Sequence, residues 1–231
     1  MHIVLTVNSP WNILNFRSGL VKALLSDGHQ VTVVAPDGLG RFELEALGCG
    51  FVPLKMDIKG QSPTQDFALM RRMRKIFSVL KPNIVLSYTI KNNVYGAIAA
   101  KSLGIPFIPN VTGLGTAFLY RKMLRKGVET LYKHAFRHCP VVFFQNSDDR
   151  TLFLDKGLIK TKQAQTLPGS GIDLAKFAPQ PFAGSQGRVR FLMIARLIRD
   201  KGVLEFIQAA EKNQELCKAI LREKAERVSH R

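Results

Sequence analysis

The chain has 231 residues, 46% of them hydrophobic, and 34 Lys and Arg against 17 Asp and Glu give it a formal net charge of +17. This composition predicts a globular protein with one substantial core and excludes an intrinsically disordered chain. The three cysteines have no C-x-x-C spacing and no neighbouring His cluster, so neither a disulfide framework nor a zinc site is expected. With no charged leader and no apolar run of about eighteen residues, we expect a cytoplasmic protein.

The charge calls for an acidic partner: an anionic membrane surface, nucleic acid or a phosphorylated small molecule. Basic residues gather at 71–75 and 120–126, where cations alternate with large apolar side chains at helical spacing. Two interpretations stay open, a solvated helix face above a core-facing stripe and a helix lying on the inner face of a membrane. Nucleic acid is not expected, because no helix-turn-helix, RNP or zinc-finger pattern accompanies the charge.

Strand and helix patterns alternate from the first residue. In chain order we predict a strand at His2–Val7, a helix at Ile13–Asp27, a strand at Gln30–Ala35, a helix at Arg41–Leu47, a strand at Phe51–Leu54, a helix at Thr64–Leu80, a strand at Ile84–Ser87, a helix at Asn93–Leu103, a strand at Pro106–Asn110, a helix at Phe118–Phe136, a strand at Val141–Gln145, a helix at Ser147–Lys156 and a strand at Gln165–Leu167. Wholly apolar strands that alternate with helices indicate a doubly wound α/β fold around a parallel sheet.

The pattern changes after residue 167. Residues 168–187 are rich in Pro, Gly and Ser, which predicts a linker. Residues 188–231 then read as the start of a second domain, with a strand at Val189–Ala195, a turn containing Arg196 and Lys201, a helix at Val203–Glu211 and a charged tail. Because a full α/β domain needs on the order of 100 residues or more, we expect this second domain to be incomplete.

Ligands of open parallel sheets bind beyond the carboxyl ends of the strands, so the loops there are the candidate binding segments. They contain Ser9, Thr89, Lys91, Thr112 and Gly113. The first loop lacks the G-x-G-x-x-G pattern of dinucleotide-binding domains, and neither a P-loop nor an H-E-x-x-H motif occurs. In the second domain, Arg196 and Lys201 flank a predicted helix N-terminus, an arrangement that favours a diphosphate.

Several segments together resemble the retaining glycosyltransferases of family four, which have the GT-B fold. They are Asn15-Phe16-Arg17, Gly28-His29-Gln30-Val31, Tyr88-Thr89-Ile90-Lys91, residues 110–115, Pro168-Gly169-Ser170-Gly171-Ile172-Asp173, Ala195-Arg196-Leu197 and Lys201-Gly202. The similarity is to the bacterial branch that builds capsular, O-antigen or glycan-lipid chains. It implies one complete Rossmann-like acceptor domain, followed by the first βα unit of a nucleotide-sugar-binding domain.

The resemblance implies roles for the residues named above. Arg196 and Lys201 would contact the diphosphate of a nucleotide-sugar donor, and Gly171 would let the backbone pass close to it. Ser9, Thr89–Lys91 and Thr112–Gly113 would face the cleft from the acceptor domain. No metal cofactor is expected, and the catalytic group is left unassigned, because many relatives have His-Gly where this chain has Thr112-Gly113.

One family feature is missing from its expected place. Members carry two Glu residues, separated along the C-terminal domain, that hold the donor sugar and ribose. Glu215 and Glu223 have a similar spacing but follow the first βα unit directly, so we interpret it as coincidence. The resemblance therefore predicts transfer of a sugar to a lipid-linked glycan acceptor, with little independent activity of this chain. A non-catalytic binding fragment and a GT-B nucleotide-sugar epimerase are the alternatives.

Overall fold

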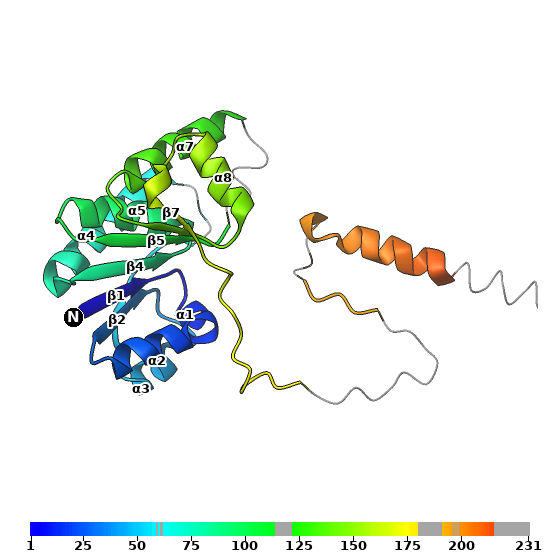
Figure 1. Ribbon diagram of the computed structural model, residues 1–231, viewed down its shortest axis with the longest axis horizontal. Coiled ribbons are helices and arrows are strands. Elements are labelled where there is room, and N and C mark those ends of the chain that lie inside the picture. The colour runs from blue at the N-terminus through cyan, green and yellow to red at the C-terminus, as the bar shows by residue number, and fades with distance from the viewer. Residues whose placement is uncertain are drawn as a thin grey trace, which may run out of the picture. The chain divides into compact units, whose positions relative to one another are not determined.

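The computed structural model (Figure 1) describes residues 1–58, 60, 62–113, 122–179, 191–195, 197 and 199–214, with the backbone alone at 122–125 and 200. The chain separates into two compact units, Met1–Ala178 and Pro179–Arg231. We call them unit 1 and unit 2. The finer division into residues 1–167, 168–187 and 188–231 stays a prediction.

Unit 1 is built on a parallel sheet of seven strands in the order β3-β2-β1-β4-β5-β6-β7. The strands are β1 (His2–Thr6), β2 (Gln30–Ala35), β3 (Gly50–Pro53), β4 (Ile84–Tyr88), β5 (Phe107–Val111), β6 (Val142–Phe144) and β7 (Ala164–Thr166). Val4 of β1 is aligned with Thr32 of β2 on one side and Val85 of β4 on the other. The predicted doubly wound α/β class is confirmed.

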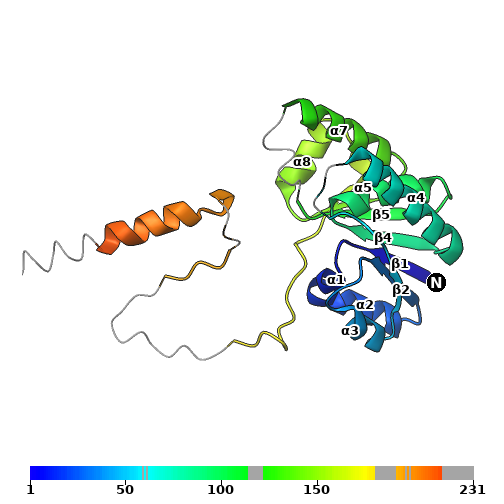
Figure 2. The same ribbon diagram turned by 180° about the vertical axis from the view of Figure 1, so that it is seen from behind.

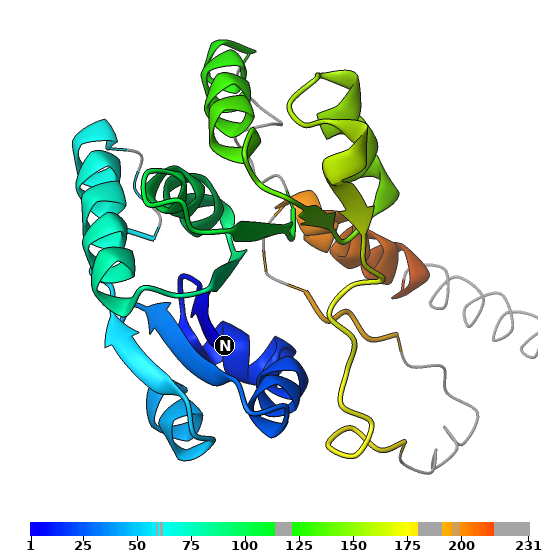
Figure 3. The ribbon, with the colours of Figure 1, turned by 60° about the vertical axis from the view of Figure 1, so that its left-hand side comes forward.

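Helices cover both faces of the sheet, as Figure 3 and the rear view in Figure 2 show. The described α-helices of unit 1 are α1 (Pro10–Phe16), α2 (Ser18–Ser26), α3 (Arg41–Ala46), α4 (Pro63–Leu80), α5 (Ile90–Lys101), α7 (Lys122–Phe136) and α8 (Ser147–Asp155). The first three enclose one hydrophobic core, and α4, α5, α7 and α8 enclose the other. The helices change face because the chain runs outward from β1 in one direction and from β4 in the opposite direction.

Aromatic packing fixes the second half of unit 1. Phe153 of α8 lies 5.1 Å from Tyr132 of α7 and 5.1 Å from Phe144 of β6, measured between ring centroids. Phe136 completes the cluster, and all four side chains are fully buried. The large apolar area that these rings remove from water holds α7, α8 and the sheet together.

The predicted single helix Ile13–Asp27 is wrong in one respect, because it is two helices that meet at Arg17. Arg17 has φ −142° and ψ 11°, outside the helical range. Its backbone N–H donates to the Ile13 oxygen at 2.8 Å and closes α1, and its oxygen accepts from the Val21 N–H at 3.0 Å and opens α2. Apolar periodicity continues across such a break, so the pattern alone did not reveal it.

Unit 2 contains the 3-10 helix η2 (Arg199–Lys201) and a helix over residues 203–214, which confirms the predicted helix. The predicted strand Val189–Ala195 is wrong for its described part, since residues 191–195 have no regular secondary structure. Phe191, Leu192 and Ile194 are at least 76% exposed. A strand needs neighbouring strands for its backbone hydrogen bonds, and no strand pairs with these residues in the described part of unit 2.

Two helical glycines should respond oppositely to alanine. A Cβ on Gly96 of α5 would lie 2.8 Å from Cζ of Phe107 and 2.9 Å from Cε of Met73, whereas one on Gly127 of α7 would meet no atom within 4 Å. We expect Gly96→Ala to lower the free energy of unfolding by about 1–2 kcal/mol through overpacking. Gly127→Ala should raise it by about 0.5–1 kcal/mol through helix propensity. Urea unfolding measures both, and equal stability of the two variants would contradict this packing.

Candidate functional site

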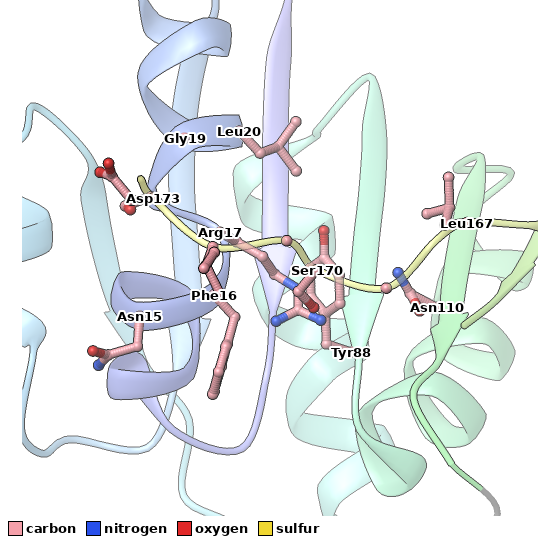
Figure 4. A pocket seen from close by; sticks show the side chains of 14 residues that line it. Asn15, Phe16, Arg17, Gly19, Leu20, Tyr88, Asn110, Leu167, Ser170 and Asp173 are labelled. Carbon is pink, nitrogen blue, oxygen red and sulfur yellow. The ribbon is translucent and has the colours of Figure 1, made fainter. Parts of the chain in front are cut away.

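A pocket of about 390 Å³ opens at the carboxyl edge of the sheet. It is lined by residues 15–20 around the α1–α2 junction, by Tyr88 of β4 and Asn110 of β5, and by Leu167 and residues 169–173 beyond β7 (Figure 4). The helices after β1 and β4 depart to opposite faces, so the pocket lies at the point where open α/β sheets bind ligands. We call it the Arg17 pocket.

Arg17 is the central cation of this pocket. Arg17 is only 8% exposed. Its Nη1 donates to Oδ1 of Asn12 at 3.0 Å, and its guanidinium carbon lies 4.0 Å from the Tyr88 ring centroid. In the described part of the chain no salt bridge joins Arg17 to a carboxylate. A cation this deeply buried normally has an anionic partner.

The Arg17–Tyr88 contact is electrostatic as well as steric. Burial lowers the pKa of the Arg17 guanidinium from its usual value, while Tyr88 acts in the opposite direction. Burial also raises the pKa of the Tyr88 phenol, which Arg17 partly opposes. The guanidinium lies over the face of the Tyr88 ring, which is a cation–π contact, and it also donates a side-chain hydrogen bond to Tyr88.

Three buried polar atoms near this edge have no hydrogen-bond partner among the described residues. They are Oγ of Ser87, Oδ1 of Asn93 and Oδ1 of Asn110. Asn93 donates through Nδ2 to the Asn110 backbone oxygen at 2.8 Å, which joins the start of α5 to β5. An unsatisfied buried acceptor costs about 1–3 kcal/mol, so such atoms indicate a place for a polar ligand or water.

The turn from β4 into α5 is strained. Thr89 has φ 72° and ψ 149°, a conformation that β-branched residues rarely adopt. Its Oγ1 donates to Oδ1 of Asn92 at 3.0 Å, and Nδ2 of the fully buried Asn92 donates to Oγ1 of Thr6 at 2.8 Å. This chain links the end of β1 to the start of α5, and it fixes the backbone next to Tyr88.

Lys91 forms a link between helices. Its Nζ lies 2.7 Å from Oδ1 of Asp66 on α4, and the Tyr95 hydroxyl donates to Oδ2 of the same carboxylate at 2.8 Å. The Lys91 and Asp66 side chains are 17% and 15% exposed. Burial, followed by the Asp66 carboxylate, raises the pKa of Tyr95. These contacts give Lys91 a structural role in addition to the predicted one.

The structure brings one of the predicted site residues into the Arg17 pocket, namely Gly171, which has φ 68°. Ser9 is the N-cap residue of α1, and Thr89 is adjacent to the lining residue Tyr88. Thr112 is exposed after β5, and Gly113 has φ 146°. Lys201 is exposed in unit 2, and Arg196 lies outside the described residues. The ligand roles of these residues stay predictions.

Arg17, Tyr88 and Asn110 have no individual role among the predictions from the sequence. Tyr88 and Asn110 stood in strand-end loops already selected as candidates, but their burial depends on neighbouring strands. Arg17 offered a signal, since Ser18 and Gly19 directly after it are poor helix formers. Its burial could be recognised only once Tyr88 was placed beneath it.

Polar side chains lie on both sides of Arg17 in the pocket. Figure 4 shows Asn15 and Asp173 on the side of α1, Arg17 over Tyr88 in the middle, and Asn110 toward β5. Ser170 accepts a hydrogen bond from Nε2 of Gln145 at 3.2 Å, and Asp173 accepts from the backbone N–H of Ala175 at 3.0 Å. A cation between hydrogen-bonding groups suits a ligand with one anionic group and several hydroxyls.

A doubly wound parallel sheet with a polar pocket at its switch point defines a Rossmann-like ligand-binding domain. The family model described as Glycosyl transferase 4-like matches residues 2–146, which is more than half of the chain. The chain therefore belongs to the glycosyl transferase 4-like family, and the resemblance noted in the sequence is confirmed.

Two curated bacterial enzymes are similar to the chain. It is 26% identical over 216 residues to the N,N'-diacetylbacillosaminyl-diphospho-undecaprenol alpha-1,3-N-acetylgalactosaminyltransferase of Campylobacter jejuni, with 86% of this chain and 57% of the relative covered. It is 24% identical over 166 residues to the UDP-Gal:alpha-D-GlcNAc-diphosphoundecaprenol alpha-1,3-galactosyltransferase of Escherichia coli, with 64% and 42% covered. The chain thus spans about half the length of these relatives.

Solved structures share the fold. HepE of Anabaena in complex with UDP-glucose superimposes with a TM-score of 0.56 at 15% identity, over 78% of this chain and 47% of that one. The glycosyltransferase of Rickettsia africae superimposes with a TM-score of 0.53 at 14% identity, over 80% and 47%. UDP-GlcNAc 2-epimerase of Methanocaldococcus jannaschii also superimposes with a TM-score of 0.53, at 16% identity over 72% of this chain and 45% of that one.

The helices in the described part of the chain include none with the length and hydrophobicity of a membrane span.

Two substitutions at Thr89 test the backbone strain. Both Thr89→Gly and Thr89→Ala lose the hydrogen bond to Asn92, but only glycine adopts φ 72° without a Cβ penalty. We expect the glycine variant to be more stable than the alanine variant by about 1–2 kcal/mol in urea unfolding. Thr130 in α7 is the control position. There the alanine variant should be more stable than the glycine variant by about 1 kcal/mol, because alanine is the better helix former. The same order at both positions would contradict the strain.

A double-mutant cycle tests the structural role of Lys91. Lys91→Met and Asp66→Asn should each destabilise unit 1, and their coupling energy should be about 0.5–3 kcal/mol because the pair is mostly buried. Lys75→Met, at an exposed position of α4, is the control and should stay within about 0.5 kcal/mol of the parent. A Lys91→Met variant of parental stability would mean that Lys91 does not stabilise the α4–α5 contact.

Proposed function

We propose that the chain takes part in glycosyl transfer from a nucleotide-sugar donor to a polyprenyl-diphosphate-linked glycan, with unit 1 binding the acceptor. The observation that carries this proposal is the family match over residues 2–146, which contains strands β1 to β6 of the sheet and much of the Arg17 pocket. Support comes from the two curated relatives, whose names both specify diphospho-undecaprenol acceptors. The product belongs to bacterial surface polysaccharide or glycan-lipid assembly, and the transfer retains the anomeric configuration.

Donor binding is assigned to unit 2. Arg196 and Lys201 contact the donor diphosphate in this proposal and neutralise the charge that grows on the leaving nucleotide. Gly171 allows close approach of the backbone, and the loops with Ser9, Thr89–Lys91 and Thr112–Gly113 border the acceptor. Cationic side chains can supply this stabilisation without a metal ion.

The acceptor places the reaction at the inner face of the bacterial membrane. In the 71–75 cluster, Arg71, Arg72, Arg74 and Lys75 are exposed, whereas Met73 is fully buried in the core. These exposed cations attract anionic headgroups electrostatically, whereas Met73 is buried and cannot enter the bilayer. Of the 120–126 cluster, the side chains at 120–125 lie outside the described part of the chain.

The test is a transfer assay with isotopically labelled UDP- and GDP-sugars and farnesyl-diphospho-GlcNAc as acceptor. It uses this chain, alone and with a polypeptide that supplies the donor half of a relative. Transfer of label to the farnesyl-linked glycan, in either arm, is the expected result. Because the family resemblance predicts little independent activity, the combined arm should give the higher rate.

Other results would favour the alternatives. Conversion of the sugar within the nucleotide-sugar, without acceptor, would indicate an epimerase. Saturable acceptor binding with no turnover in either arm would indicate a non-catalytic binding protein. The absence of both acceptor binding and transfer would overturn the proposal.

A further inference from the structure

We propose that the Arg17 pocket binds the sugar-phosphate group of the lipid-linked acceptor, with the phosphate on Arg17 and the sugar hydroxyls on the flanking Asn15, Asn110 and Asp173. This inference rests on the proposed function and gives its acceptor a defined site. It assigns an anion site to unit 1 in addition to the donor contacts proposed for Arg196 and Lys201 of unit 2, and Gly171, which is proposed to approach the donor, also lines this pocket.

The first argument is the charge of Arg17. The guanidinium is buried and held by Asn12 and the Tyr88 ring, and no carboxylate neutralises it among the described residues. Asn12 accepts from one of its five N–H donors and the Tyr88 hydroxyl from another. The remaining donors suit the paired oxygens of a phosphate, and α2 adds its N-terminal backbone at Ser18 and Gly19.

The second argument is independent of the cation. Asn110 is 8% exposed, lines the pocket, and its Oδ1 has no hydrogen-bond partner in the described part of the chain. A sugar hydroxyl would satisfy that oxygen. On the other side of Arg17, Asp173 and Asn15 can also hydrogen-bond hydroxyls (Figure 4). Because polar groups lie on both sides of the cation, the ligand is a phosphorylated sugar instead of a bare phosphate.

The third argument favours the acceptor over the donor. Phe16, Leu20 and Ile172 line the same pocket and are 43%, 38% and 71% exposed. They form an apolar rim beside the cation. The first isoprene units of a prenyl diphosphate are wholly apolar and would bury this rim more completely than the largely polar uridine and ribose of a nucleotide-sugar.

The experiment is isothermal titration of the chain with farnesyl-diphospho-GlcNAc, GlcNAc 1-phosphate, UDP-GlcNAc and unphosphorylated GlcNAc. We expect the farnesyl compound to bind most tightly, GlcNAc 1-phosphate to bind measurably, and GlcNAc to show no binding. Arg17→Gln should weaken binding of the first two probes about 10–100-fold, as expected for the loss of a charge-assisted hydrogen bond. Binding of UDP-GlcNAc should change less than twofold.

A second variant tests the site independently in case Arg17→Gln does not fold. Ser170 is an exposed lining residue whose Oγ accepts from Gln145, and an Asp carboxylate there can accept the same bond. Ser170→Asp should therefore fold normally yet weaken the phosphorylated probes about tenfold by repulsion. The matched control is Ser78→Asp, at an exposed position near the end of α4 and the amino edge of the sheet. It should leave every dissociation constant unchanged.

Three results would overturn this inference. The first is equal affinity for GlcNAc and GlcNAc 1-phosphate. The second is unchanged affinity of the farnesyl compound in both Arg17→Gln and Ser170→Asp. The third is a loss confined to UDP-GlcNAc, which would assign the pocket to the donor. These results differ from failure of the proposed function, since transfer with an unchanged KM for the farnesyl acceptor in Ser170→Asp would reject the site while keeping the transferase.

Discussion

The position of β1 between β2 and β4 is the constraint on which the rest of unit 1 depends. The chain runs from β1 toward β2 and β3 on one side and from β4 toward β7 on the other, so its helices must cover opposite faces. Backbone ends and helix N-termini converge beyond the carboxyl ends of β1 and β4, where the Arg17 pocket lies. The fully buried Val4 and Leu5 hold β1 in this place, because they pack into different cores on its two faces.

Several polar groups at this edge of the sheet reduce the stability of the fold. Burial of the Arg17 charge, the strained Thr89 backbone, and the oxygens of Ser87 and Asn110 that have no hydrogen-bond partner among the described residues each cost folding free energy. A sequence selected for stability alone would have replaced them, for example by an apolar residue in place of Arg17 and glycine in place of Thr89. Their concentration at one edge of the sheet is therefore evidence for a binding site that is independent of the family match.

Much of the fold could be predicted because it follows from local periodicity. In unit 1 the apolar strands and the amphipathic helices were predicted to within a few residues, and the parallel class followed from their alternation. What periodicity cannot supply is the partner of a side chain. Lys91 was selected as a cation at a strand end, but its contact with Asp66 joins residues 25 positions apart in the chain. The break at Arg17 and the burial of Asn110 likewise depend on tertiary neighbours.

A comparison of two strand–helix segments shows how far a local sequence pattern can determine structure. The β1–α1 segment and residues 189–211 both have a strand pattern followed by a helix pattern, yet β1 is a buried strand and residues 191–195 are not in a strand. The helix predicted at Val203–Glu211 is present in the structure over residues 203–214, because its backbone hydrogen bonds are internal to the segment. A strand has no internal bonds, so β1 owes its structure to β2 and β4. The Arg17 pocket is likewise confined to elements of unit 1, and for that reason acceptor binding can be tested on this chain separately from donor binding.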